Sequence, residues 1–134
     1  MALIKVKLDK KLTPESIRDM LYFFVNAAKN MHLETKSFAE HKAFGEFYDK
    51  LADFQDDCLE KLMGYMGGKR LGAPKIAEIP EYTEKSAVQL VDEVGEFAYS
   101  LYEWAEEKKF CDIENMAQSL SGDAAKTAYL LTLK

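Results

Sequence analysis

One glycine- and proline-rich stretch near the middle of the chain limits the possible folds more than any other feature. Residues 64–82 contain four of the seven glycines and two of the three prolines. Both residue types destabilise helix interiors, so this stretch is predicted to be a long connection. On each side of it, apolar residues recur at helical spacing. The sequence therefore predicts an all-α fold in which one long loop separates two helical halves.

The first half is predicted to form two helices in a tight antiparallel hairpin. The apolar positions place these helices at residues 14–34 and 38–63, with a break near Thr35–Ser37. Thr13, which precedes a proline, is a suitable N-cap for the first helix. The Ser37-Phe38-Ala39-Glu40 pattern matches a capping box at the start of the second helix.

The second half is predicted to form another pair of helices. Thr83 is expected to cap the third helix and Asp112 the fourth. Four amphipathic helices with one longer crossover between the second and the third predict a ferritin-like four-helix bundle. A chain of this length builds one core, so a single domain is expected at residues 13–134, after a Lys-rich N-terminal arm at residues 1–12.

Composition excludes several classes of protein. The 18 basic and 23 acidic residues give a net charge of −5, and hydrophobic residues make up 48% of the chain, which excludes a disordered tail. No apolar run approaches the roughly 20 residues of a membrane-spanning helix, and the first residues lack the apolar core of a secretion signal. The two cysteines, Cys58 and Cys111, are expected to be free thiols in a reducing compartment, so the predicted location is cytoplasmic.

The only two histidines lie on either side of the predicted hairpin turn. His32 and His41 are each about four residues from the break, and residues equidistant from an antiparallel turn lie at the same height. Two facing imidazoles suit a metal site. The alternative is that the two histidines are unrelated and lie near a helix end.

A row of carboxylates follows on the second helix. Asp49, Asp53, Asp56 and Glu60 share one helix face, which is either a ligand set or an ordinary solvated surface. His41 and Asp56 are about 22 Å apart along a helix, at 1.5 Å per residue. If both bind one ion, that ion must lie between two subunits, so a metal site predicts a dimer or a larger homo-oligomer.

These residues resemble a known family. The stretch with His32, Phe38-Ala39-Glu40-His41, Asp56-Asp57-Cys58-Leu59-Glu60 and Gly64 is similar to the Dps branch of the ferritin-like superfamily. That family has two histidines, then an aspartate and a glutamate four residues apart, and then a loop that begins with glycine. The last helix, from Asp112 onward, is also similar.

The resemblance implies an iron-oxidising site across a two-fold interface, with His32 and His41 from one subunit and Asp56 and Glu60 from the other. Iron would be oxidised there by peroxide or oxygen and stored in a hollow oligomer, which makes ferroxidase activity an expectation. Manganese and zinc also suit these donors. The sequence departs from the family pattern at Leu33, which replaces a tryptophan, and at Gly45, which replaces an acidic residue.

Two functions of other classes also fit the sequence. Asp92-Glu93-Val94-Gly95-Glu96 and Glu103-Trp104-Ala105-Glu106 are similar to the acidic pairs of MazG-like nucleotide pyrophosphohydrolases, although both fall on one predicted helix. The other alternative is a metal-free helical bundle that acts as an interaction protein, because methionine and aromatic residues are abundant.

Four lysines crowd the N-terminal arm: Lys5, Lys7, Lys10 and Lys11. Such an arm could make weak, non-specific contact with DNA phosphates, or it could serve only as a solubilising terminus. The acidic body and the two arginines favour no sequence-specific recognition.

Overall fold

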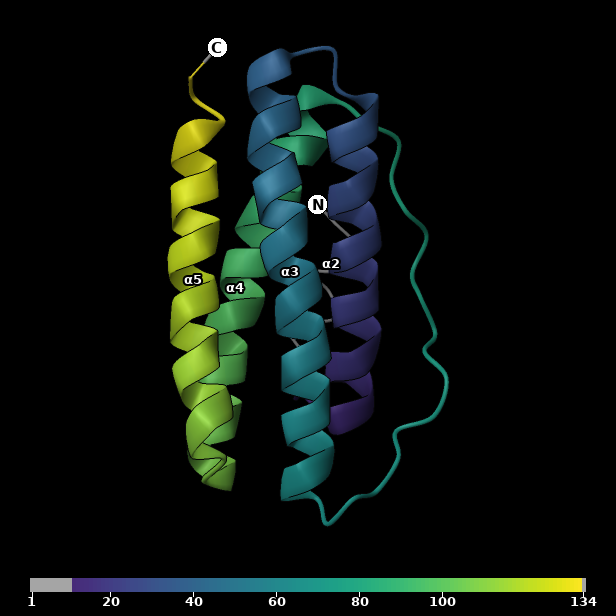
Figure 1. The fold of residues 1–134 in the computed structure, drawn as a ribbon, viewed down its shortest axis with the longest axis vertical. Coiled ribbons are helices and arrows are strands. Elements are labelled where there is room, and N and C mark those ends of the chain that lie inside the picture. The colour runs from purple at the N-terminus through teal and green to yellow at the C-terminus, as the bar shows by residue number, and fades with distance from the viewer. Residues whose placement is uncertain (1–10, 134) are drawn as a thin grey trace.

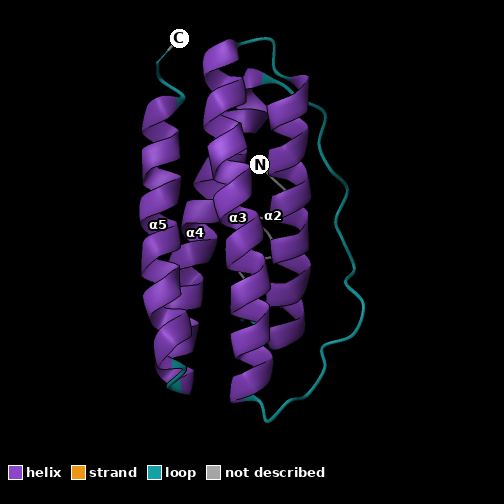
Figure 2. Cartoon of the chain, viewed as in Figure 1, coloured by secondary structure: helices purple, strands orange, loops and turns teal. Residues whose placement is uncertain are grey.

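A computed structural model of the protein describes residues 11–133, which form a bundle of four helices (Figure 1). The helices are α2 (Pro14–Glu34), α3 (Phe38–Tyr65), α4 (Glu84–Lys108) and α5 (Cys111–Leu130). The described residues include no strand (Figure 2). The all-α prediction is confirmed, and α3 extends two residues beyond its predicted end. Residues 1–10 of the predicted N-terminal arm lie outside the described residues.

The helices are connected as two hairpins joined by a crossover. Helices α2 and α3 are antiparallel, and the loop of residues 66–83 then runs along the outside of α2 to the opposite end of the bundle (Figure 1). Helix α4 therefore runs parallel to α3, and α5 returns beside α4. Packing is most extensive within the two hairpins, less so between α3 and α5, and slight between α2 and α4.

Three of the four helix starts have the expected N-cap residue, but the capping box predicted for Ser37 and Glu40 is only half formed, because the Ser37 N–H donates to Thr35 Oγ1 instead. Thr13 and Thr83 each form a reciprocal capping box with the serine three residues later. The Ser37 hydroxyl accepts a hydrogen bond from the Glu40 backbone N–H at 3.2 Å. These bonds satisfy amide groups that have no partner inside the helix.

The prediction that Asp112 caps the fourth helix is wrong. Helix α5 begins at Cys111, two residues before the predicted start, and its N-cap, Phe110, makes no side-chain capping bond. The Phe110 ring instead stacks on Tyr65 with ring centroids 4.5 Å apart, and it meets Trp104 edge-on at 5.6 Å. Asp112 lies in the first turn, where it accepts a 2.5 Å ion pair from Lys61 of α3. Aromatic packing between helices, and not a local cap, therefore fixes this helix start.

The core lies along the axis of the bundle and receives side chains from all four helices. The fully buried large side chains are Phe24, Phe44, Phe47, Phe97, Ile17, Leu21, Met31, Leu51, Leu62, Leu101 and Ile113. Phe24 of α2 meets Phe97 of α4 edge-on at 5.3 Å, a favourable aromatic geometry. Cys58 is also buried there, and burial raises the pKa of its thiol to about 12.

Buried polar groups attach the crossover to α2. The Arg18 guanidinium donates to the carbonyl oxygen of Leu71 and pairs with Asp19 at 2.9 Å. Asp19 in turn accepts the backbone N–H of Lys75 at 2.9 Å. Because the Arg18 side chain is almost fully buried, its positive charge depends on these partners.

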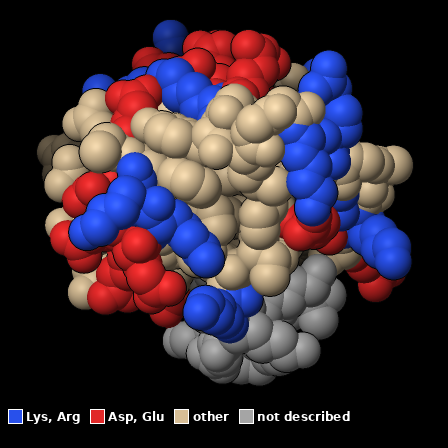
Figure 3. All heavy atoms as spheres, turned by 90° about the horizontal axis from the view of Figure 1, so that it is seen from below, with Lys and Arg blue, Asp and Glu red and all other residues tan. Residues whose placement is uncertain are grey.

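The surface is charged and mixed. Seen from the end of the bundle where α3 and α4 finish, acidic and basic side chains alternate around the rim and other residues fill the centre (Figure 3). Among residues 11–133, no helix has the length and apolar character needed to span a membrane.

Candidate metal-binding site

The two histidines face one another across the α2–α3 turn, as the sequence predicts. His32 lies in the last turn of α2 and His41 in the first turn of α3. Their rings are stacked, with centroids 3.9 Å apart and an angle of 16° between the planes. Both side chains are half-buried. The pair thus holds the end of one helix against the start of the next.

Hydrogen bonds determine which nitrogen of each imidazole carries a proton. His32 Nδ1 lies 2.8 Å from the carbonyl oxygen of His41, and His41 Nδ1 lies 2.7 Å from the carbonyl oxygen of His32. A carbonyl oxygen only accepts, so each Nδ1 must be the donor. In the neutral ring, Nε2 then carries a lone pair. This is the arrangement in which a backbone carbonyl orients a histidine to bind a metal.

Gly45 makes room for the His32 ring. A Cβ atom at this position would lie 3.0 Å from His32 Cε1 and 3.2 Å from His32 Nδ1. Sequence comparison alone presented this glycine as a departure from the Dps pattern. The packing gives it a physical reason, because a larger residue on this turn of α3 would displace the ring.

A buried carboxylate supports the same end of the bundle. Glu40 accepts hydrogen bonds from the Tyr82 hydroxyl at 2.5 Å and from the Thr35 hydroxyl at 2.8 Å. Burial, followed by the bond to Glu40, raises the pKa of Tyr82. The sequence suggested Glu40 only as a capping residue. Its partner Tyr82 follows 42 residues later, and no local pattern indicates that contact.

The histidines line a surface pocket of about 650 Å³ between α2 and α3. Lys29 and Lys42 also line it, and Lys29 lies over the Tyr48 ring at 5.2 Å from its centroid. Two apolar side chains at the same rim, Phe38 and Leu33, are 75% and 62% exposed. Glu46 and Asp49 line it as well, so this end of the α2–α3 face combines imidazoles, ammonium groups, carboxylates and exposed apolar surface.

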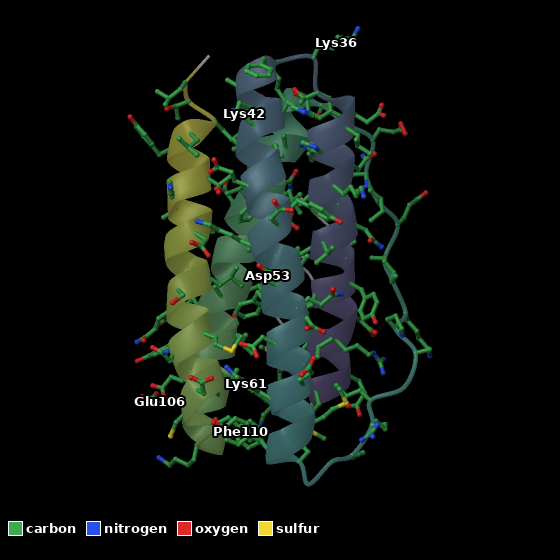
Figure 4. All side chains as sticks on the ribbon, in the orientation of Figure 1. Lys36, Lys42, Asp53, Lys61, Glu106 and Phe110 are labelled. Atoms are coloured by element: carbon green, nitrogen blue, oxygen red, sulfur yellow. The ribbon has the colours of Figure 1, made fainter. Side chains whose placement is uncertain are left out.

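The predicted carboxylate ligands lie elsewhere on α3. Asp56 and Glu60 are exposed, about one helical turn apart, and about 22 Å or more along the helix from His41. Figure 4 shows Lys42 close to the α2–α3 turn and Asp53 near mid-height, and acidic and basic residues are mixed along α3. Within residues 11–133, no three histidine, cysteine or acidic side chains converge on a point that could hold a metal ion. The predicted histidine and carboxylate ligands are therefore far apart within one chain.

The acidic pairs that suggested a pyrophosphohydrolase lie on α4 alone. Asp92, Glu96, Glu103 and Glu106 are exposed, whereas Glu93 is buried. A magnesium–pyrophosphate site needs such pairs on facing helices, and these two motifs do not face each other. Figure 4 shows Glu106 close to the end of the bundle where α4 finishes.

Comparison with known proteins gives two similarities. A protein of Enterobacteria phage T4, described as an uncharacterized 14.6 kDa protein in the mobD-ri intergenic region, is 28% identical over 104 residues, which cover 77% of this chain and 75% of the phage protein. No solved structure matches the chain. The family model that matches spans residues 32–131, from the first histidine to the end of the last helix. The chain therefore belongs to DUF5856, a family of unknown function.

Proposed function

We propose that the protein is a ferritin-like metal-binding protein of the Dps type, which takes up iron at a site completed by a second copy of the chain. His32 and His41 would come from one subunit, and Asp56 and Glu60 from its two-fold mate. The substrate would be ferrous iron, with oxidation and storage as the expected activity. Manganese and zinc suit the same donors.

The observation that carries this proposal is the state of the two imidazoles. Both Nδ1–H groups are bound by backbone carbonyl oxygens, so both Nε2 atoms keep a lone pair in the neutral rings, and both residues line a surface pocket. A histidine pair that only joined two helices would require the two hydrogen bonds, but it would not require an accessible pocket beside it. The pocket beside the pair therefore favours a ligand.

The order of the helices supports a ferritin-like relationship. An antiparallel hairpin, a crossover that runs the length of the bundle and a second antiparallel hairpin make up the ferritin arrangement. In that arrangement the second and third helices are parallel, as α3 and α4 are here.

Distances along α3 indicate how two copies would meet. If His41 of one copy is to approach Asp56 of the other, the two α3 helices must lie antiparallel, with the two-fold axis midway between these residues, close to Tyr48. Lys29 and Lys42 of each copy would then lie near Asp56 and Glu60 of the other. Such a charge arrangement is self-complementary, as an isologous interface requires. Phe38 and Leu33 would supply the apolar contact.

The test combines oligomer size with metal content. The full-length protein is mixed with ferrous iron without oxygen, separated on a sizing column with light scattering, and analysed for iron. We expect a dimer or larger oligomer that retains iron. His41→Asn should lose the iron and keep the fold, because the asparagine amide can still donate to the His32 carbonyl in place of Nδ1–H, whereas Nε2 is gone.

A mixing experiment tests whether the site is shared. Asp56→Asn with Glu60→Gln should also lose iron, and Glu78→Gln with Glu81→Gln, which removes the same charge from exposed loop positions, should not. Refolding the His41→Asn chain with the Asp56→Asn/Glu60→Gln chain should restore about a quarter of the wild-type iron, since half of the dimers then carry one intact site of two. A monomer, or no recovery on mixing, would contradict the proposal.

A further inference from the structure

A groove between α4 and α5 is separate from the histidine pocket. It has a volume of about 790 Å³, and small residues such as Gly95, Ser121 and Ala125 line it. Exposed Asp92 and Tyr99 form part of its α4 side. Small residues leave space for another segment of chain to approach closely, and the carboxylates give that space a negative rim.

The negative rim continues as a row along α4. Asp92, Glu96, Glu103 and Glu107 follow at steps of four, seven and four residues, so they lie on one face of the helix. From Glu107 to Asp92 this row is about 22 Å long. A segment that covered the row and the groove would need positive charges on one side and apolar groups on the other.

The first described residue lies at one end of this row. The Lys11 ammonium is 3.8 Å from the Glu107 carboxylate, close to the end of α4. Ten residues precede Lys11 in the sequence, enough to span about 33 Å when extended. The chain outside the described residues is therefore long enough to reach Asp92.

That segment has the complementary pattern. Ile4-Lys5-Val6-Lys7-Leu8 alternates between apolar and basic residues, so an extended chain carries three apolar groups on one side and two lysines on the other. Extended chain places Lys7 about 13 Å and Lys5 about 20 Å from Lys11. Glu96 and Asp92 lie about 16 Å and 22 Å from Glu107 along α4. These distances are close to those of Lys7 and Lys5 from Lys11, and a lysine side chain is long enough to span the remaining gap.

We propose that residues 4–10 dock along α4 of their own chain, with the apolar side in the α4–α5 groove and the lysines paired with the acidic row. Docking in this way leaves the lysines neutralised by carboxylates. Phosphate groups of DNA then compete with the acidic row for the same ammonium groups. Both contacts weaken as salt increases, because both are ion pairs at the surface.

Zero-length cross-linking of the full-length protein tests the docking directly. A carbodiimide joins a lysine to a carboxylate only when they are in contact, and peptide mass spectrometry identifies the pair. At low salt we expect Lys5 and Lys7 joined to Glu96, Asp92 or Glu103. In a mixture of ¹⁴N- and ¹⁵N-labelled protein, both halves of each cross-linked peptide should carry the same label, which shows that the contact is within one chain.

Trypsin provides the second measurement. Cleavage after Lys5 and Lys7 should accelerate on the order of fivefold in an Asp92→Asn/Glu96→Gln variant, through loss of two surface ion pairs. The matched Glu78→Gln/Glu81→Gln variant should cleave at the wild-type rate. Cross-links of mixed label would assign the segment to a second copy and overturn the proposal. Absent cross-links, or equal cleavage in both variants, would show that the segment does not dock.

Discussion

Replacing Gly45 by alanine sets two opposite effects against each other. A glycine inside a helix is about 1 kcal/mol less favourable than alanine, so the substitution should stabilise α3 by that amount. The added Cβ, however, would lie 3.0 Å from His32 Cε1, closer than ordinary van der Waals contact, so the ring would have to shift by a few tenths of an ångström. The ring is held by its 2.8 Å hydrogen bond and by its stack on His41, so it cannot move without weakening both.

The magnitudes predict that the contact wins. Loss of the hydrogen bond costs about 1 kcal/mol, and loss of the ring stack costs about 0.5 to 1 kcal/mol. Subtracting the helix gain leaves Gly45→Ala destabilised by roughly 0.5 to 1 kcal/mol. Gly122 provides the matched control, because it lies inside α5 and a Cβ there would meet nothing within 4 Å. Gly122→Ala should therefore stabilise the protein by about 1 kcal/mol.

Urea unfolding followed by far-UV circular dichroism measures the difference. The two variants should differ in unfolding free energy by about 1.5 to 2 kcal/mol, with unchanged dependence on urea. If Gly45→Ala is as stable as Gly122→Ala, the His32 ring does not pack on Gly45, and the reasoning about the oriented imidazole pair fails with it. Nitrogen-15 chemical shifts of the imidazoles give an independent check, because they distinguish Nδ1–H from Nε2–H rings.

Three further predictions follow from buried polar groups. The pKa of Cys58 is raised from 9.0 to about 12, so the stability that its neutral thiol contributes is complete below pH 9 and is lost as the pH rises towards 12. The fall in unfolding free energy at alkaline pH should therefore be smaller in Cys58→Ala than in wild type. The same fall should be unchanged in Cys111→Ala, whose thiol is exposed. Arg18→Met should lower the unfolding free energy by about 2 to 3 kcal/mol, because Asp19 and the Leu71 carbonyl oxygen both lose the guanidinium that pairs with them. In the same urea titration, Arg70→Met, at an exposed loop position, should change the unfolding free energy by less than about 0.5 kcal/mol. Tyr82→Phe should destabilise the protein by about 1.5 to 2 kcal/mol, because the hydrogen bond to Glu40 is lost. Calorimetry compares it with Tyr129→Phe, which alters an exposed tyrosine on α5. An equal fall in melting temperature in both variants would contradict the prediction.

The sequence predicts the features that depend on neighbouring residues. Threonine before a helical run indicates Thr13 and Thr83 as caps, because the capping bond spans only three residues. The opposition of His32 and His41 follows from their equal distance from one turn. These features need no knowledge of which helices pack together.

Features that depend on residues far apart in the sequence could not be predicted in this way. Asp112 has the right residue type for a cap, yet the start of α5 is set by Phe110 against Tyr65, which is 45 residues earlier in the chain. Glu40 fits a capping box, but Tyr82 and Thr35 engage its carboxylate. The hydrogen bonds that orient the histidines depend on rotamers that Gly45 permits, and spacing alone does not specify rotamers.

The crossover also makes the packing of the two hairpins a step within one molecule. Each hairpin has an apolar side that only the other hairpin covers, so two separate hairpins would have to find each other by diffusion. Residues 66–83 join them covalently and span the bundle along α2. A connection of this kind holds its two ends at a local concentration in the millimolar range. The union of the hairpins is therefore independent of how much protein is present, whereas any association between whole copies remains subject to dilution.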